Sequence, residues 1–225
     1  MRISDGSWRK SIVWAIALVV GFGCACALDR PIWQALPDPQ LRTSETSRLF
    51  RAAGLVTTHA LFALALVLCD WPLRTTHGLG TALRRGGLLI LSSGLSGALA
   101  EALKLVLRRH RPFPTRIGWD GEYSYIPWRV DPFDAGHMGL PSGHAATAFG
   151  AAWMLCLLFP RATPVWLFFA AGCVYSRILD QKHFLSDAYY SMVLAGAVAL
   201  ALWRAAGAMK LGLVSRSTAE RERQS

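Results

Sequence analysis

Long apolar runs, separated by polar and basic connectors, constrain the fold more than any other feature of this sequence. A helix needs ~20 apolar residues to cross the hydrocarbon core of a bilayer, where no water can satisfy the backbone of an irregular segment. Of the 225 residues, 53% are hydrophobic and 17% are charged, whereas about 25% are charged in a typical soluble domain. We therefore predict an all-α, polytopic membrane protein.

The prediction comprises six transmembrane helices in a single domain over residues 1–225. The apolar runs are 12–28, 52–69, 86–107, 143–159, 164–179 and 187–208, and a polar C-terminal tail follows at about 210–225. The first run also resembles a signal peptide, because Ala25, Cys26 and Ala27 have the small side chains of a cleavage site. Its apolar core exceeds the ~7–15 residues of a signal peptide, so we expect it to remain as the first span.

The net charge of +10 does not indicate nucleic-acid binding. Lys and Arg lie in short segments between the apolar runs, instead of along one helix face or within a DNA- or RNA-binding motif. We expect them to flank membrane spans, and some can meet an anionic substrate or anionic lipid headgroups. The five cysteines lie in or beside apolar runs, and their odd number argues against a full disulfide framework.

Three polar clusters stand at the ends of apolar runs: KLVLRRHRP (104–112), PSGH (141–144) and SRILDQKHFLSD (176–187). Counting the spans alternately places all three clusters on one side of the membrane. When the candidate site residues are set aside, Lys and Arg are more frequent on the opposite side, which predicts cytoplasmic termini and outward-facing clusters. The connector 108–140, rich in Trp and Tyr, is expected either to form one wall of a substrate entrance or to be a plain interfacial anchor.

In the third cluster, His183 and Asp187 are four residues apart. A helix that begins near His183 would put both on one face, where the carboxylate can hold the imidazole in one tautomer. A histidine held in this way can act as a base or a nucleophile. Taken alone, such a pair is more often found on a helix surface than in a catalytic site.

The first cluster predicts an anion site. Lys104 and Arg111 are seven residues apart, so a helix would carry both on one face, with no acidic residue at that spacing. Pro112 then ends the helix. An arginine suits bidentate contact with phosphate oxygens, whereas a lysine acts as a point charge. Lys104 and Glu101 are also ionisable residues within a span, which makes them functional candidates.

In the second cluster, Ser142 stands where a helix N-cap belongs. The amides of Gly143 and His144 would then be unpaired donors at the positive end of a helix, which favours a bound phosphate. His144 could reach the oxygen of a leaving group. Together the three clusters meet the needs of phosphoryl transfer. The sequence has no carboxylate cluster for magnesium and no HExxH or P-loop pattern, so we expect metal-independent chemistry through a phosphohistidine.

The three motifs also resemble those of a known family. Lys104, six residues and Arg111-Pro112 are followed by Pro-Ser-Gly-His, and then by Ser176-Arg177, five residues, His183, three residues and Asp187. This set, complete and in order, is similar to the type 2 phosphatidic acid phosphatase and vanadium haloperoxidase superfamily.

The resemblance implies a six-helix membrane phosphatase with a catalytic helical core and no cofactor. It implies that His183 attacks phosphorus, that Asp187 orients His183, and that His144 protonates the leaving group and then activates water. It assigns the phosphate to Lys104, Arg111, Ser142, Gly143 and Arg177. The segment Asp180-Gln181-Lys182 is more polar than the small residues expected there, which leaves open the shape and charge of the substrate entrance.

The resemblance leaves several lipids open as substrates: phosphatidic acid, phosphatidylglycerol phosphate, undecaprenyl pyrophosphate and lipid A. The segment HFLSD is similar to that of the bacterial lipid A type. We therefore expect a lipid phosphatase of the bacterial inner membrane whose site faces outward. Two alternatives remain: a vanadate-dependent haloperoxidase, and a non-enzymatic membrane transport or scaffold protein with a vestigial site.

Overall fold

The structure is a computed structural model that describes residues 5–35, 44–70, 78–112, 122–130, 133 and 135–224. Helices dominate these residues, which confirms the all-α prediction. The helices are α1 (Asp5–Ala35), α3 (Glu45–Ala52), α4 (Val56–Asp70), α5 (Gly78–Leu107), α6 (Gly143–Leu158), α7 (Thr163–Leu179) and α8 (Leu185–Gln224). Two short 3₁₀ turns, Ala135–His137 and Pro160–Ala162, lie between them.

Helix α6 is the centre of the bundle and packs against α5, α7 and α8. Its first three turns are almost fully buried and consist mainly of alanine and glycine. Small residues allow membrane helices to approach closely. At the crossing of α5 and α6, a Cβ on Gly150 would lie 2.6 Å from the Ser92 carbonyl oxygen, and the Ser92 hydroxyl donates to the Gly150 carbonyl at 2.6 Å.

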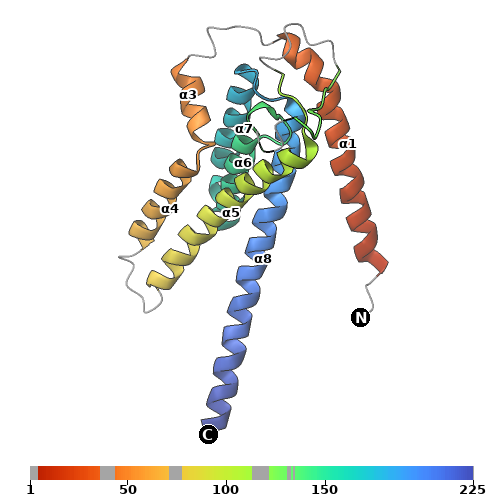
Figure 1. Cartoon of the computed structure of the whole chain (residues 1–225). Coiled ribbons are helices and arrows are strands. Elements are labelled where there is room, and N and C mark those ends of the chain that lie inside the picture. Colours follow the sequence, from red (N-terminus) through yellow and green to blue (C-terminus); the bar gives the residue numbers. More distant parts are fainter. Residues whose placement is uncertain are drawn as a thin grey trace.

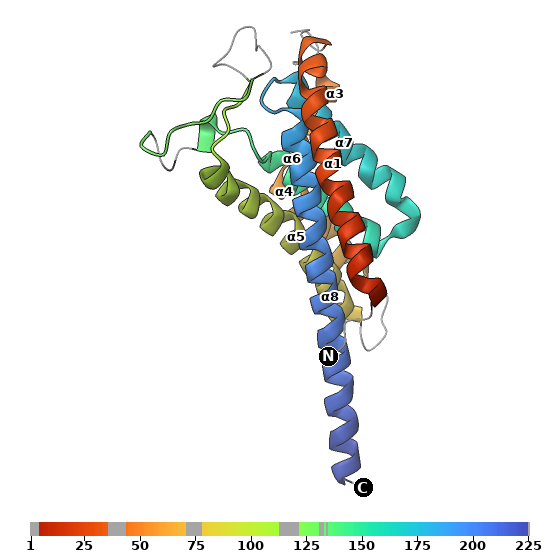
Figure 2. The ribbon, with the colours of Figure 1, turned by 90° about the vertical axis from the view of Figure 1, so that its right-hand side faces the viewer.

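The other helices surround this centre (Figure 1). Helices α3 and α4 lie on one side and α1 on the other, where α1 packs along α8. Helix α5 crosses the bundle obliquely, and α8 continues beyond the other helices toward the C-terminus (Figures 1 and 2). The predicted polar tail is therefore an extension of α8.

Four helical segments are long and apolar enough to cross a membrane: Ser11–Ala35, Gly80–Leu107, Pro160–Leu179 and Leu185–Gly207. Helices α3 and α4 add a fifth if this pair, bent by 65°, crosses as one broken span. Helix α6 is apolar but has only 16 residues. The described residues thus form a multi-pass membrane protein with four or five spans by length and composition, where the sequence predicted six.

The predicted span 52–69 corresponds to α4, which begins at Val56 after a break in the helix at residues 53–55. Gly54 lies against α6 and α7 so closely that a Cβ there would come within 2.7 Å of the Cys173 sulfur and 2.9 Å of the His144 Cβ. Helix α3 before the break begins at an N-cap, where the Ser44 hydroxyl accepts from the Ser47 amide. It lies in the polar connector between the first two predicted apolar runs.

Helix α5 ends at Leu107, because Arg108 adopts a left-handed backbone conformation with φ 49°. The chain then runs out beside the bundle and returns to α6 (Figure 2). Isolated β-bridges join Arg109 to Tyr125 and His110 to Met138, which fold this connection over the end of α5. Arg111 therefore lies in an extended segment, and the prediction that it shares a helix face with Lys104 is wrong.

Candidate active site

The three sequence clusters meet at one end of the bundle, where α5 ends, α6 begins and α7 leads into α8. His144 lies within electrostatic range of Lys104, Arg111 and Arg177. His183 is within range of Lys104 and Arg177 as well. The fold thus brings the predicted cations and both histidines into one site.

His183 has a defined tautomer. Its Nδ1 lies 2.9 Å from the Gly139 carbonyl oxygen and 3.6 Å from the Asp187 Oδ2. A carbonyl only accepts, so Nδ1 carries the proton and Nε2 keeps its lone pair. The ring is 3% exposed, and burial lowers the pKa of His183 to about 4, although Asp187 opposes the shift. The imidazole is therefore neutral at neutral pH and has a nucleophilic nitrogen.

Asp187 is fully buried in the first turn of α8. The Phe184 amide donates to its Oδ2 at 2.8 Å, and Arg109 donates to its Oδ1. Burial by itself would lower the pKa of Arg109, but the charge and hydrogen bond of Asp187, together with the charges of Asp29 and Tyr123, outweigh burial and raise that pKa. Helix α8 begins at Leu185, so His183 precedes the helix. The nearest partner of its Nδ1 is the Gly139 carbonyl oxygen at 2.9 Å, and the carboxylate of Asp187, the partner expected from the sequence, lies next to it at 3.6 Å.

Ser142 is the N-cap of α6, as predicted, and its hydroxyl accepts from the Ala145 amide at 3.4 Å. The Ser142 amide donates to the Ser191 hydroxyl at 2.8 Å, and this hydroxyl donates to the Asp187 carbonyl at 2.7 Å. The start of α6 is thereby tied to the first turns of α8. First-turn amides such as those of Gly143 and His144 have no acceptor within their own helix, so they are available to an anion.

Lys104 is paired with a carboxylate. Its Nζ lies 2.6 Å from the Glu101 Oε1, one turn earlier on α5. Glu101 is 51% exposed, and a Cβ added to Gly143 would collide with its Oε1. The sequence argument that no acidic residue stands beside the two cations was therefore wrong. A carboxylate lies between Lys104 and the start of α6, where an anion would bind.

Arg177 and Arg111 are held by oxygen atoms at the rim of the site. Arg177 Nη1 donates to Asp180 Oδ2 at 3.1 Å, and Arg51 of α3 approaches the same oxygen at 3.4 Å. Arg111 Nε donates to the Met138 carbonyl at 3.0 Å. The unexpected carboxylate of Asp180 thus faces the cation site and links it to α3.

Three residues at this site were missed by the sequence argument. Gly139 supplies the acceptor for His183, Arg109 holds Asp187, and Asp29 of α1 accepts hydrogen bonds from Ser186 beside Asp187. Asp29 could have been noticed, because a carboxylate at the end of an apolar run is costly. Nothing in the run of arginines distinguishes Arg109 from Arg108.

Within the described ranges, no group of three or more His, Cys, Asp or Glu side chains is placed to hold a metal ion. The groups that can interact with a phosphate are cations, amides and histidines.

Comparison with known proteins agrees with this geometry. The model of the PAP2 superfamily matches residues 85–209, more than half of the chain and all three clusters. A crystal structure of the first transmembrane PAP2 type phosphatidylglycerolphosphate phosphatase from Bacillus subtilis is similar in fold, with a TM-score of 0.55 and 18% sequence identity over 83% of this chain and 92% of that one. A search of curated proteins found no match. The chain therefore belongs to the PAP2 superfamily and is a membrane lipid phosphatase.

Proposed function

We propose that this protein, as one membrane domain, hydrolyses a phosphate monoester or pyrophosphate on a lipid through a phosphohistidine, without a metal ion. The observation that carries the proposal is the tautomer of His183. The Gly139 carbonyl, at 2.9 Å, fixes the proton on Nδ1, so Nε2 keeps its lone pair. A buried, neutral imidazole next to a cluster of cations is suited to attack phosphorus.

In the first step, Nε2 of His183 forms a bond to phosphorus as the bond to the lipid oxygen breaks. Lys104, Arg111 and Arg177 bind the equatorial oxygens, together with the amides at the start of α6. Asp187 stabilises the positive charge that develops on the imidazole. Burial and the charges of Arg177 and Lys104 lower the pKa of His144 to about 4, so the ring takes up a proton when the anionic phosphate binds beside it and then gives this proton to the departing lipid oxygen.

In the second step, His144 takes a proton from water, and the resulting hydroxide attacks phosphorus. The nitrogen–phosphorus bond breaks, inorganic phosphate leaves, and His183 regains its free Nε2. Each histidine thus returns to its starting protonation state, so the cycle consumes only lipid phosphate and water.

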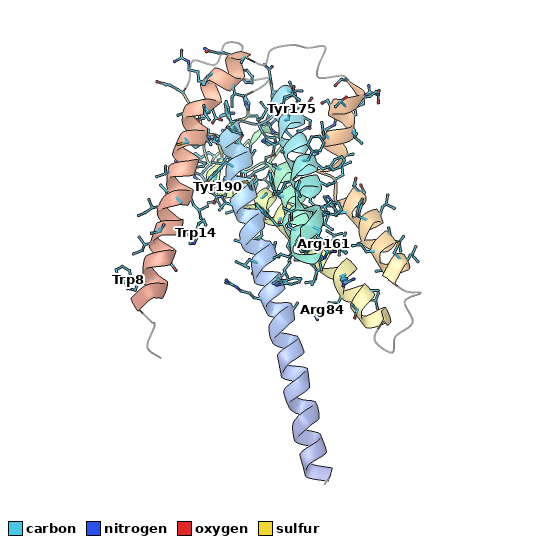
Figure 3. The ribbon with its side chains drawn as sticks, turned by 180° about the vertical axis from the view of Figure 1, so that it is seen from behind. Trp8, Trp14, Arg84, Arg161, Tyr175 and Tyr190 are labelled. Atoms are coloured by element: carbon cyan, nitrogen blue, oxygen red, sulfur yellow. The ribbon has the colours of Figure 1, made fainter. Side chains whose placement is uncertain are left out.

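We further propose a bacterial inner-membrane protein whose site faces outward. Arg84, Arg161 and Trp8 lie toward the bundle end opposite the site, whereas Tyr175 lies toward the site end (Figure 3). Basic residues favour the cytoplasmic side of a membrane.

The substrate candidates are phosphatidic acid, phosphatidylglycerol phosphate, undecaprenyl pyrophosphate and lipid A. Phosphatidylglycerol phosphate is tested first, because the similar crystal structure is named for it.

The test is release of inorganic phosphate from these lipids by the purified protein in detergent, with and without a chelator. We expect turnover of at least one lipid that persists in the chelator and falls with vanadate, a mimic of five-coordinate phosphorus. Loss of activity in the chelator, restored by magnesium or zinc, would refute the metal-free mechanism. Halide oxidation in the presence of vanadate would indicate the haloperoxidase alternative instead.

A further inference from the structure

We propose that Arg109 and Asp29 are positioning residues, which make the first helix α1 a part of the catalytic centre. The inference rests on the function proposed above. It assigns to Arg109 the task of fixing Asp187 beside His183, and to Asp29 the task of holding the groups that fix Arg109.

A continuous chain of buried contacts carries the inference. Arg109 Nη2 donates to Asp187 Oδ1 and, at 2.7 Å, to the Ser186 hydroxyl. The Ser186 hydroxyl donates to Asp29 Oδ2 at 2.5 Å, and the Ser186 amide donates to Asp29 Oδ1 at 3.0 Å. None of these four side chains is more than 2% exposed. α1 is thereby joined through Ser186 and Arg109 to Asp187, which stands beside the nucleophile.

The direction of each contact determines what Arg109 does. Arg109 binds Oδ1 of Asp187, so Oδ2 is the oxygen that faces the Phe184 amide and His183 Nδ1. Without the guanidinium, a fully buried carboxylate would lose its counter-charge and take up a proton more readily. The charge that steadies the imidazolium during phosphoryl transfer would then be lost.

Two aromatic rings keep Arg109 in place. Its guanidinium carbon lies 4.5 Å from the centre of the Tyr123 ring and 5.3 Å from that of Phe184. Cation–π contacts of this kind are stronger where water is excluded. The Tyr123 hydroxyl also donates to Asp29 Oδ2 at 2.7 Å, so the same carboxylate holds both the ring and Ser186.

Asp29 also acts through its charge. It lies within electrostatic range of Arg109, so two buried carboxylates share one guanidinium. The titratable groups near Asp187 are Arg109, His183 and, farther away, Lys104. Replacing Asp29 with asparagine should loosen the position of Arg109 but leave its charge for Asp187. The Arg109 and Asp29 variants should therefore differ in their dependence on pH.

The experiment compares Arg109→Gln, Arg109→Lys and Asp29→Asn with the wild type and with Arg108→Gln. Arg108 is a matched control, because it is an adjacent and equally buried arginine whose side chain donates to the loop carbonyls of Ile126, Pro127 and Val130. The readouts are kcat, KM, the pH dependence of kcat, vanadate binding and thermal stability, all measured on the full chain in detergent.

For Arg109→Gln, we expect kcat to fall about 10- to 100-fold, by analogy with the loss found when a hydrogen-bond partner that orients a metal ligand is removed. KM and vanadate binding should change little, because the phosphate ligands are intact. The acid limb of the kcat profile should move toward neutral pH. Arg109→Lys should recover part of kcat, and Asp29→Asn should lower kcat without moving the acid limb.

The results that would overturn this inference differ from those that would refute the proposed function. If Arg108→Gln reproduces the fall in kcat and the moved acid limb, Arg109 is a structural residue and the inference is wrong. Wild-type kcat in Arg109→Gln or in Asp29→Asn would also overturn it. If Arg109→Gln does not fold, the Arg109→Lys and Asp29→Asn variants decide the question. Absence of both turnover and vanadate binding in the wild type would instead refute the proposed function, and the inference with it.

Discussion

At the scale of single residues, the chemistry depends on one proton on His183. The Gly139 carbonyl fixes that proton on Nδ1, and the cations proposed to bind phosphate are other side chains. We therefore expect His183→Ala to abolish turnover while vanadate binding largely survives. Asp187→Asn should impair catalysis less completely, because it removes a charge but leaves the nucleophile. Full activity of His183→Ala in the phosphate-release assay would exclude His183 as the nucleophile.

The low pKa of His183 predicts a dependence on pH. Burial favours the neutral ring, so the folded protein takes up this proton only near pH 4, whereas the unfolded chain takes it up near 6.5. His183 thus contributes stability above pH 6.5 that is lost as the pH falls toward 4. The acid limb of kcat/KM should lie near pH 4, after correction for the phosphate group, whose own ionisation lies at about pH 6. An acid limb near pH 6.5 would mean that His183 keeps its ordinary pKa because water reaches the ring.

A different prediction follows from the position of Glu101, because its carboxylate lies where a phosphate would bind. It must leave Lys104 and the start of α6 when substrate arrives. Glu101→Gln removes the competing charge, so KM should fall and vanadate should bind more tightly, by up to about fivefold for a half-exposed pair. Glu45→Gln, at the exposed pair with Arg48, is the matched control. Weaker binding in Glu101→Gln would show that the carboxylate recognises the substrate.

Residues of the site were predictable where their role is local. The cap at Ser142 depends on the next three residues, so its sequence pattern is sufficient. The Arg109–Asp187 contact joins residues 78 positions apart, and two adjacent arginines are equivalent in sequence. Both are buried, and Arg108 binds the carbonyls of the returning loop whereas Arg109 binds Asp187, a division that depends on the tertiary fold.

At the scale of elements, α1, α4, α5, α6, α7 and α8 correspond to the six predicted apolar runs, whereas α3 lies outside these runs. Hydropathy measures transfer into lipid, so it could not detect the bend between α3 and α4. Gly54 lies in this bend, and its backbone lies against His144 and Cys173. The bend therefore belongs to the architecture of the site.

The close contacts of Gly54 predict that alanine is tolerated less well at this position than at Gly23 on α1. Gly54→Ala places a methyl group within 3 Å of two side chains, and overpacking of this kind costs about 1–3 kcal/mol. We expect a lower melting temperature and, because His144 is one of the two neighbours, a lower kcat. Gly23→Ala on α1 is the control, since a Cβ there meets nothing within 4 Å and alanine favours a helix. Equal melting temperatures for both variants would show that the α3–α4 bend is not tightly packed.

At the scale of the whole molecule, the site and the basic residues Arg84 and Arg161 occupy opposite ends of the bundle (Figure 3). Orientation can be tested with single cysteines in a background that lacks Cys24, Cys26, Cys69, Cys156 and Cys173, all of which are unpaired. Phe133→Cys lies in the connection between α5 and α6, where the native side chain is 86% exposed. Arg161→Cys lies in the exposed turn between α6 and α7.

We expect an impermeant thiol reagent to label Phe133→Cys from outside intact spheroplasts. Arg161→Cys should be labelled only after the membrane is opened, because the positive bias of its end favours the cytoplasm. Lys182→Cys, beside the nucleophile, should follow Phe133→Cys and so report the side of the site itself. The reverse pattern would place His183 on the cytoplasmic side, and lipids that are dephosphorylated on the outer face of the membrane, such as undecaprenyl pyrophosphate, would then cease to be candidate substrates.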